Sequence, residues 1–173
     1  MSAAAAEIVA AIGRWQAGFR VPLVVAIDGH GAAGKTTIAA AVARIVSATV
    51  VHTDDYFYEA REGGDRRPMA QYYAWEALRE EALEPAIARV RYAPPQRSGA
   101  RLILVEGVSA ASPALADLVD RTVFVAASEP LRLERLHKRI SDEEWDEEWL
   151  YAERQYFASR PPDSFDLVVS GET

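Results

Sequence analysis

The sequence predicts an α/β fold, with a parallel sheet of about five strands and helices on both faces in a three-layer sandwich. Two observations support this prediction. Runs of almost continuously apolar residues recur along the chain, which is typical of strands buried on both faces. Segments with helical periodicity separate these runs, which indicates parallel strands joined by helical crossovers. A length of 173 residues suits one domain with a sizeable core, so we expect a single domain over residues 1–173.

The N-terminal half is expected to supply a docking helix and the first two strands. Residues 1–19 place apolar side chains at helical spacing, at Ile8, Ile12, Trp15 and Phe19. We then expect a buried strand at residues 21–28, a helix at 35–47 and a second strand at 48–52. A polar loop at residues 59–68 and a longer helix at 70–90 are expected to follow. The periodicity of the two internal helices directs these apolar positions inward: Ile38, Val42, Ile45, Trp75, Leu78, Leu83 and Ile87.

The C-terminal half is expected to supply the remaining strands and two more helices. Apolar runs predict strands at residues 101–107, 121–127 and 165–171, with a short helix near 113–118. Helical patterns cover residues 130–140 and 142–158. This order of elements continues the alternation that predicts a parallel sheet.

Composition and charge argue against several classes of function. The formal net charge of −7 argues against a nucleic-acid backbone as the main partner, although a small phosphate ligand needs only a local positive pocket. The chain has no cysteine, which excludes disulfides and cysteine-based metal sites, and we expect a cytoplasmic protein. No segment predicts a membrane span, and Glu7 and Arg14 interrupt the N-terminal apolar run, unlike a secretory signal.

A glycine-rich turn follows the first predicted strand. Within it, Gly29, Gly34, Lys35 and Thr36 match the pattern G-x-x-x-x-G-K-[S/T], with a strand before and a helix after. Glycines let backbone N–H groups close around phosphate oxygens, and the helix points its positive end at the same spot. Lys35, one of only two lysines, adds a charge for the β- and γ-phosphates, and the Thr36 hydroxyl can bind Mg²⁺. The motif therefore predicts ATP and Mg²⁺ as ligands, held by Gly29, His30, Gly31, Ala32, Ala33, Gly34, Lys35, Thr36 and Thr37.

Carboxylates follow the second and third predicted strands. Asp54 and Asp55 come just after the second strand, and Glu106 lies at the end of the third. Because ligands bind at the carboxyl edge of a parallel sheet, we expect Asp54 to take or orient the proton of a substrate hydroxyl. Glu106 is expected to hold Mg²⁺ or its waters. The alternatives are a solvated turn for the aspartates and a solvent-facing acid for Glu106.

Arginines at helical spacing form one face of the predicted helix at residues 130–140. These are Arg132, Arg135 and Arg139, and such a face could close over a transferring phosphate and stabilise its charge. We therefore expect residues 130–158 to form a lid and the helix that follows it. A solvated basic face is the alternative. Of the histidines, His30 is expected near the nucleotide, His52 in a structural role and His137 at the surface.

Aromatic residues are candidates for the pocket of the phosphate acceptor. Together with Asp55, the expected substrate residues are Tyr56, Phe57, Tyr73, Trp75 and Tyr92, with Tyr72 as a further candidate. Packing in the core explains such aromatics about equally well. Trp145 and Trp149 share a helix face, and packing of that helix on the domain is the favoured interpretation.

Taken together, residues 21–171 resemble the uridine kinase group of P-loop kinases, and also phosphoribulokinase and bacterial pantothenate kinase. The resemblance rests on the phosphate-loop motif, on Asp54-Asp55-Tyr56-Phe57 and on Glu106-Gly107. It implies a P-loop NTPase fold and ATP-dependent transfer of phosphate to a hydroxyl of a small molecule, with a nucleoside as the first candidate. It also implies that Asp54 acts as base near Mg²⁺, that Glu106 serves the metal, and that the lid arginines are Arg135 and Arg139. Since the group includes monomers and assemblies, a homodimer is left open.

Three features depart from the pattern of that group. Tyr73-Ala74-Trp75 stands where the group has an aspartate between two aromatics, and SDEEWDEEW makes the expected lid acidic. Phe57 stands where the group's Asp-x-Phe-Tyr stretch has its tyrosine, although Tyr58 follows. A nucleotide-binding regulatory protein with weak or no ATPase activity is therefore one alternative. A nucleoside monophosphate kinase is another, and the arginines that it would need lack diagnostic spacing at Arg61, Arg66, Arg67, Arg79, Arg89 and Arg91.

Overall fold

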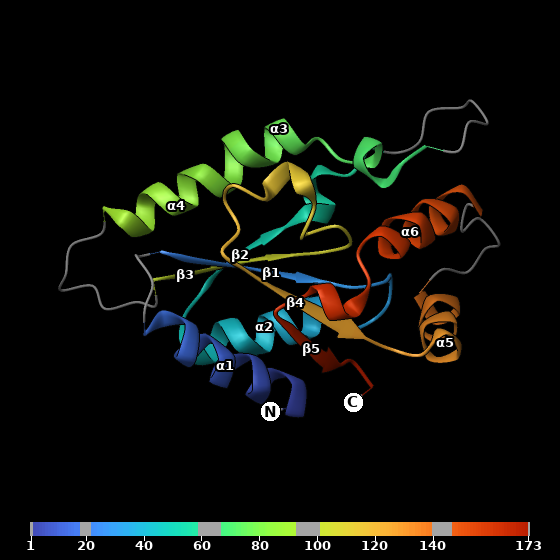
Figure 1. Cartoon of the computed structure of the whole chain (residues 1–173), viewed down its shortest axis with the longest axis horizontal. Helices are drawn as coiled ribbons and strands as arrows, with labels where there is room; N and C mark the ends of the chain where they lie inside the picture. The colour runs from blue at the N-terminus through green and yellow to red at the C-terminus, as the bar shows by residue number, and fades with distance from the viewer. Residues whose placement is uncertain (1, 18–21, 59–66, 93–100, 140–146, 173) are drawn as a thin grey trace.

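The computed structural model describes residues 2–17, 22–58, 67–92, 101–139 and 147–172 (Figure 1). Five parallel strands form one sheet in the order β2-β3-β1-β4-β5. The strands are β1 (Leu23–Asp28), β2 (Thr49–His52), β3 (Leu102–Glu106), β4 (Arg121–Ala126) and β5 (Leu167–Ser170). Every residue of the central strands β1 and β3 is buried. This sheet confirms the predicted fold class.

Helices cover both faces of the sheet (Figure 1). On one face lie α1 (Ala3–Gln16) and α2 (Lys35–Val46), which pack on each other and share one apolar core with the strands. On the other face lie α3 (Trp75–Ala77) and α4 (Glu84–Arg91), over a second apolar core. The result is the expected three-layer sandwich.

The two helices of the first face mostly bury the predicted positions. Ile8 and Ile12 of α1 are buried, as are Ile38 and Val42 of α2. Ile45 is 48% exposed, because it lies in the last turn of α2, just before the chain leaves the helix in a left-handed conformation at Ser47. The predicted inward position of Ile45 is therefore wrong, and Phe19 lies outside the described residues.

The helix expected at residues 70–90 is interrupted near its start. A 3₁₀ turn at Met69–Tyr72 is followed by an extended stretch, in which Ala74 N–H donates to the Tyr56 carbonyl. The helix then runs from Trp75 to Arg91, with a π-helical segment at Leu78–Leu83 directly before Pro85. Since proline lacks an N–H and clashes with the carbonyl four residues back, the wider π turn accommodates it.

The carboxyl ends of all five strands meet at one edge of the sheet, on the right in Figure 1. Beside this edge lie α5 (Glu129–Arg139) and α6 (Glu147–Ser159), from the region expected to form a lid. The short helix expected near 113–118 is a 3₁₀ turn at Pro113–Leu115. Among the described residues, no helix is long and apolar enough to cross a membrane.

Candidate active site

The glycine-rich turn and Asp54 line the same cavity at the carboxyl edge of the sheet. The cavity has a volume of about 220 Å³. Six of the residues that line it belong to the turn and the start of α2, and four come from other parts of the chain. They are Gly31, Ala32, Gly34, Lys35, Thr36, Thr37, Asp54, Val108, Leu136 and Trp149. The structure thus brings together most of the expected nucleotide residues and one of the two aspartates.

Lys35 is held inside the turn that precedes it. Its side chain is buried, and Nζ donates to the carbonyls of Gly29 and His30 at 2.9 and 2.8 Å. Burial lowers the pKa of Lys35, while the nearby carboxylates of Asp28 and Glu106 oppose that shift. These two hydrogen bonds therefore link the start of α2 to the first residues of the turn, next to the cavity.

The backbone of the turn depends on its first glycine. Gly29 has φ +145°, and a Cβ there would lie 2.5 Å from the Val125 carbonyl oxygen of β4. A side chain at this position would therefore push the turn off the sheet. From there the turn leads into α2, whose first three residues, Lys35, Thr36 and Thr37, line the cavity. Such a helix start attracts phosphate.

Glu106 and Thr36 form a pair of oxygen ligands suited to Mg²⁺. The Thr36 hydroxyl donates to Glu106 Oε2 at 3.2 Å, and His52 Nδ1 lies 2.6 Å from Oε1. Glu106 is only 3% exposed, so its charge is held by these two partners and not by solvent. Mg²⁺ prefers oxygen ligands and retains waters and phosphate oxygens, so one hydroxyl and one carboxylate fit its needs. His52 thus orients Glu106, consistent with its expected structural role.

Asp54 and Asp55 lie in a single 3₁₀ turn, Thr53–Tyr56, just after β2. Both carboxylates are exposed, but only Asp54 lines the cavity. The position of Asp54 at the cavity is compatible with the role that the sequence analysis gave it. Asp55 is not among the residues that line the cavity.

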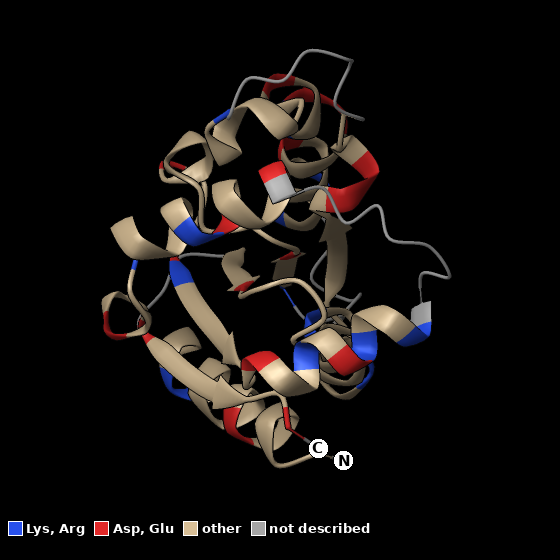
Figure 2. Ribbon diagram, turned by 90° about the vertical axis from the view of Figure 1, so that its right-hand side faces the viewer, with Lys and Arg blue, Asp and Glu red and all other residues tan. Residues whose placement is uncertain are grey.

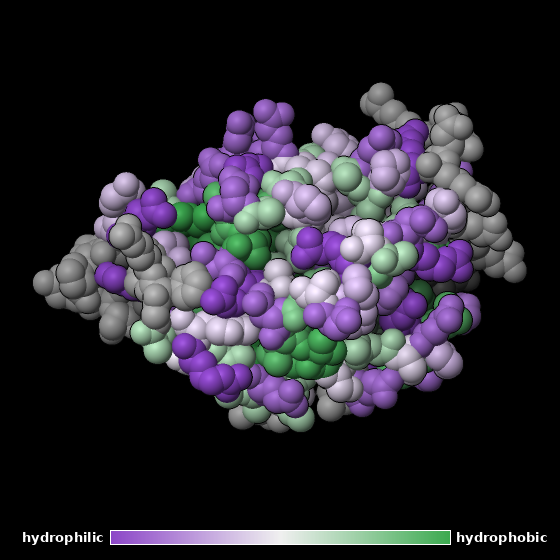
Figure 3. All heavy atoms as spheres, viewed as in Figure 1, coloured by the Kyte–Doolittle hydropathy of each residue, from purple (hydrophilic) through white to green (hydrophobic). Residues whose placement is uncertain are grey.

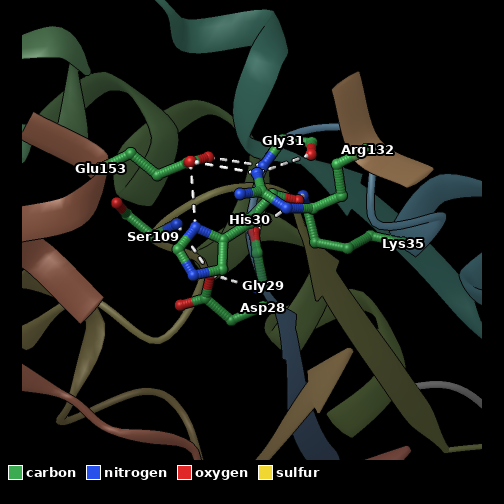
Figure 4. Close-up of polar contacts among 8 residues, drawn as sticks. All are labelled: Asp28, Gly29, His30, Gly31, Lys35, Ser109, Arg132 and Glu153. Carbon is green, nitrogen blue, oxygen red and sulfur yellow. Dashed lines mark hydrogen bonds and ion pairs between the residues drawn. The ribbon is translucent and has the colours of Figure 1, made fainter. Parts of the chain in front are cut away.

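A buried carboxylate from α6, Glu153, reaches the phosphate turn (Figure 4). It accepts a hydrogen bond from Gly31 N–H at 2.5 Å, and His30 Nδ1 donates to it at 3.0 Å. Arg132 Nη1 lies 3.3 Å from the same carboxylate and 3.3 Å from the Gly31 carbonyl oxygen. Burial alone would raise the pKa of Glu153, but the His30 and Gly31 donors outweigh it and hold the pKa below its usual value.

His30 does not point into the cavity, contrary to the expectation that it contacts the nucleotide. Its ring packs 4.2 Å from the ring of Phe157 and edge-on to Phe124. The Glu153 carboxylate draws the imidazole toward α6, which leaves only the backbone of His30 in the turn. Sequence analysis missed Glu153, although an acid on the same helix face as Trp149 and Tyr156 was an available signal.

Asp28 supports the turn from below. Its buried carboxylate accepts hydrogen bonds from the N–H groups of Gly29, Ser109 and Ala111 and from the Tyr156 hydroxyl, at 2.7 to 3.0 Å. Burial nevertheless raises the pKa of Asp28, and the hydrogen bonds partly offset that rise. Asp28 thereby ties β1 to the segment after β3 and to α6.

The arginines of α5 lie close to the carboxyl edge (Figure 2). Besides Arg132, Arg135 reaches the turn, where its guanidinium donates to the Ala32 carbonyl at 3.2 Å and to the Gly171 carbonyl at 2.8 Å. Both arginines thus contact the phosphate turn. The side chain of Arg139 and all of Trp145 lie outside the described residues, and His137 is exposed, as expected.

Most of the expected acceptor aromatics cluster beside the cavity around Trp149. The rings of Phe57 and Tyr72 both lie 5.3 Å from the Trp149 ring, and Tyr73 lies 6.3 Å from it. The extended stretch after Tyr72 brings these rings together, because the backbone of Tyr73 forms an antiparallel β-bridge with that of Phe57. Trp75 joins the cluster through Tyr73 at 4.8 Å, and Tyr56 packs on the neighbouring core. Trp149 therefore both packs α6, as favoured, and lines the cavity.

Tyr92 is not part of this cluster. It is 80% exposed at the end of α4, which runs away from the carboxyl edge (Figure 1). The expectation that Tyr92 lines the acceptor pocket is therefore wrong, and so is the alternative that it packs in the core.

No known protein family and no curated protein sequence matches the chain. Its structure is similar to a possible uridine kinase from Bacillus stearothermophilus, with a TM-score of 0.58 and 16% identity, over 94% of this chain and 97% of the other. The chain has the P-loop NTPase fold.

Two further structures share this fold. A candidate fructose transport system kinase from Silicibacter sp. has a TM-score of 0.58 and 18% identity, over 98% of this chain and 100% of the other. A gluconokinase from Sinorhizobium meliloti has a TM-score of 0.50 and 16% identity, over 90% of this chain and 86% of the other. At such identities the similarity establishes the fold and leaves the reaction to be proposed.

Proposed function

We propose that this protein is an ATP-dependent phosphotransferase that moves the γ-phosphate of ATP to a hydroxyl of a small molecule. The observation that carries the proposal is the shared cavity, in which the phosphate turn and the Asp54 carboxylate are neighbours. A turn that only bound nucleotide would not need an exposed carboxylate at that place. Phosphoryl transfer needs one, to take or orient the proton of the attacking hydroxyl.

The phosphate groups would bind to the turn and to the start of α2. Backbone N–H groups from Gly31 to Thr37 and the Lys35 ammonium supply positive charge there. Thr36 and Glu106 would hold Mg²⁺, which neutralises charge on the β- and γ-phosphates when bound. These groups lower the barrier by stabilising the charge that spreads over the transferred phosphate.

The transfer step itself would centre on Asp54. The acceptor hydroxyl oxygen bonds to the γ-phosphorus while the bond from that phosphorus to the β–γ bridging oxygen breaks, releasing ADP. The hydroxyl proton passes to the Asp54 carboxylate. Arg132 and Arg135, already in contact with the turn, would stabilise the transferring phosphate with α5 closed over the site, excluding water that competes with the acceptor.

The first candidate for the acceptor is a nucleoside, which would bind beside the aromatic cluster around Trp149. Aromatic side chains offer flat surfaces on which a planar base can stack. Phe57 is 41% exposed and its ring lies 5.3 Å from that of Trp149, which lines the cavity, so part of the cluster is accessible. Ala74 supplies no carboxylate for ribose hydroxyls, so a sugar or another alcohol is the alternative within the same reaction class.

An assay of ADP release against a panel of nucleosides, nucleotides, sugars and pantothenate-like alcohols tests the proposal. A hydroxyl acceptor that raises ADP release well above the acceptor-free rate supports it and names the substrate. Nucleotide binding with no phosphorylated product from any member of the panel would instead favour a regulatory protein. A product formed only on a nucleoside monophosphate would favour a nucleoside monophosphate kinase.

Asp54→Asn tests the proposed base separately. Loss of the carboxylate should lower kcat at least about 100-fold, while the affinity for Mg·ADP stays within about twofold, because the phosphate turn is untouched. Steady-state kinetics and calorimetry measure the two quantities. Asp163→Asn, at an exposed position outside the cavity, serves as the matched control. Normal turnover by Asp54→Asn would remove Asp54 from the mechanism.

A further inference from the structure

A second cavity, of about 440 Å³, lies outside the candidate active site. Its walls come from the 3₁₀ turn Met69–Tyr72, the segment after β3 and the C-terminal half of α6. No residue lines both this cavity and the one at the phosphate turn. Its volume falls within the range of about 300 to 1,000 Å³ that is usual for small-molecule sites.

Arg160 brings a positive charge to this cavity. Its guanidinium lies over the Phe165 ring, with Cζ 5.5 Å from the ring centre, and its buried Nε has no hydrogen-bond partner in the described part of the chain. Within that part, no carboxylate forms an ion pair with it, unlike Arg79, Arg121 and Arg132. The half-buried guanidinium therefore carries its charge without an anionic partner in the described part of the chain, so an anionic ligand would be stabilised beside it.

The rest of the wall is mostly apolar. Pro68, Met69 and Pro113 form a surface suited to the body of a small organic molecule. Ser109 also lines the cavity, with a hydroxyl that is buried and has no partner among the described residues, and with φ +67°. Backbone strain of this kind in a residue other than glycine is often found at ligand sites.

Hydrogen bonds hold these walls in place. The Tyr156 hydroxyl and the Ser109 N–H both donate to Asp28, and the Ser159 hydroxyl donates to the Tyr156 carbonyl. Figure 4 shows Ser109 beside Asp28 under the phosphate turn. The cavity is therefore formed before any ligand arrives, which reduces the entropic cost of binding.

We propose that this cavity binds a small organic anion, whose carboxylate or phosphate group pairs with Arg160 and whose apolar body lies against Met69 and the two prolines. A planar guanidinium suits both anions, because it donates two parallel hydrogen bonds to a pair of oxygens. The proposal does not depend on the proposed phosphotransfer, since it concerns binding in the absence of nucleotide.

Two probes, phenyl phosphate and phenylacetate, test the proposal with the full chain and no nucleotide. Amide chemical shifts are followed by NMR during titration of each probe. Saturable binding of at least one probe is expected, with the largest shift changes at amides of residues 69–70 and 155–160. The probe that binds more tightly identifies which anion the cavity takes.

Arg160→Gln should weaken that binding at least about tenfold, as expected for the loss of a charged hydrogen bond. Arg154→Gln is the matched control, because Arg154 is exposed on α6, which ends directly before Arg160, and does not line the cavity. Unchanged amide shifts outside the cavity show that each variant is folded. The shift changes in the wild type locate the binding site even if a variant does not fold.

Three results would overturn the proposal. The first is the absence of saturable binding by both probes. The second is shift changes centred on the phosphate turn, with binding lost in Lys35→Ala and retained in Arg160→Gln. The third is equal weakening by Arg160→Gln and Arg154→Gln.

Discussion

At the scale of single residues, Glu153 connects three parts of the candidate site through one carboxylate. It contacts Gly31 and His30 of the phosphate turn and Arg132 of α5, while it belongs to α6. A buried charge is stable only when such partners surround it, and removing the charge leaves them without an acceptor. We infer that Glu153 positions the turn and Arg132 relative to each other.

Glu153→Gln should therefore destabilise the protein by about 1–3 kcal/mol near neutral pH, because the variant replaces a charged acceptor with a neutral amide. The pKa of Glu153 is held below its ordinary value of 4.5, so its stabilising effect is present above that value. The effect declines as pH falls through the lower pKa of the folded state. Urea unfolding of wild type and variant at a series of pH values measures this difference.

Glu80→Gln is the control for this experiment, since Glu80 is exposed and does not line the cavity. A loss of stability that is the same at every pH, or none at all, would show that the charge of Glu153 does not hold the turn.

Gly107 is a second residue whose replacement should have a large effect. It has φ +145°, and a Cβ there would overlap the buried Thr53 side chain, beside Asp54. Gly107→Ala should cost about 2–4 kcal/mol through backbone strain and overpacking. Gly13→Ala in α1, where nothing lies within 4 Å of the added methyl, should be neutral or stabilising. Thermal unfolding measures both, and equal stability of the two variants would contradict this account.

At the scale of elements, α6 presents one face to the site. Trp149 lines the phosphate cavity, Glu153 contacts the turn and Tyr156 contacts Asp28, at spacings of four and three residues. Ligand binding at the turn should therefore change the surroundings of an indole ring on this helix.

Mg·ADP should change the tryptophan fluorescence of the protein, and Trp149→Phe should remove most of that change. Trp15→Phe is the matched control, because Trp15 packs against α1's own core on the other face of the sheet. Fluorescence titration of the three proteins measures the effect. A full response in Trp149→Phe, or its loss in Trp15→Phe, would argue that α6 does not sense the nucleotide.

The elements themselves were largely predictable, because apolar runs and helical periodicity are local signals. The five strands agree with prediction to within a few residues, since burial on both faces makes each run continuous. The break at Ala74 was not predictable in this way. It arises from backbone pairing of residues 72–74 with residues 56–58, which is a long-range contact. The π-helical segment before Pro85 likewise has no periodic signature.

At the scale of the whole molecule, the parallel sheet explains why residues far apart in sequence meet. All carboxyl ends share one edge, so the turn after β1, Asp54 after β2 and Glu106 at the end of β3 gather there. The motif and the fold together predicted this gathering. They could not predict that the His30 ring would turn to Glu153 and not to the cavity, or that Tyr92 would be exposed at the far end of α4. Side-chain direction decides the first, and the position of the helix decides the second.

The surface of the molecule agrees with a domain that buries its apolar residues in two cores. The face seen in Figure 3 is mostly hydrophilic, with separate apolar patches. Although the formal net charge is −7, Lys35 and Arg135 place positively charged groups at the phosphate turn. Attraction of a polyphosphate therefore depends on that turn and not on the field of the whole protein.

Isothermal titration calorimetry with Mg·ATP tests the central claim most directly, using the only two lysines of the chain as a matched pair. We predict saturable binding by the wild type, at least about tenfold weaker binding by Lys35→Ala, and unchanged binding by Lys138→Ala, whose side chain is exposed and pairs with Glu134. No heat from the wild type, or equal affinity in the Lys35→Ala variant, would contradict the account.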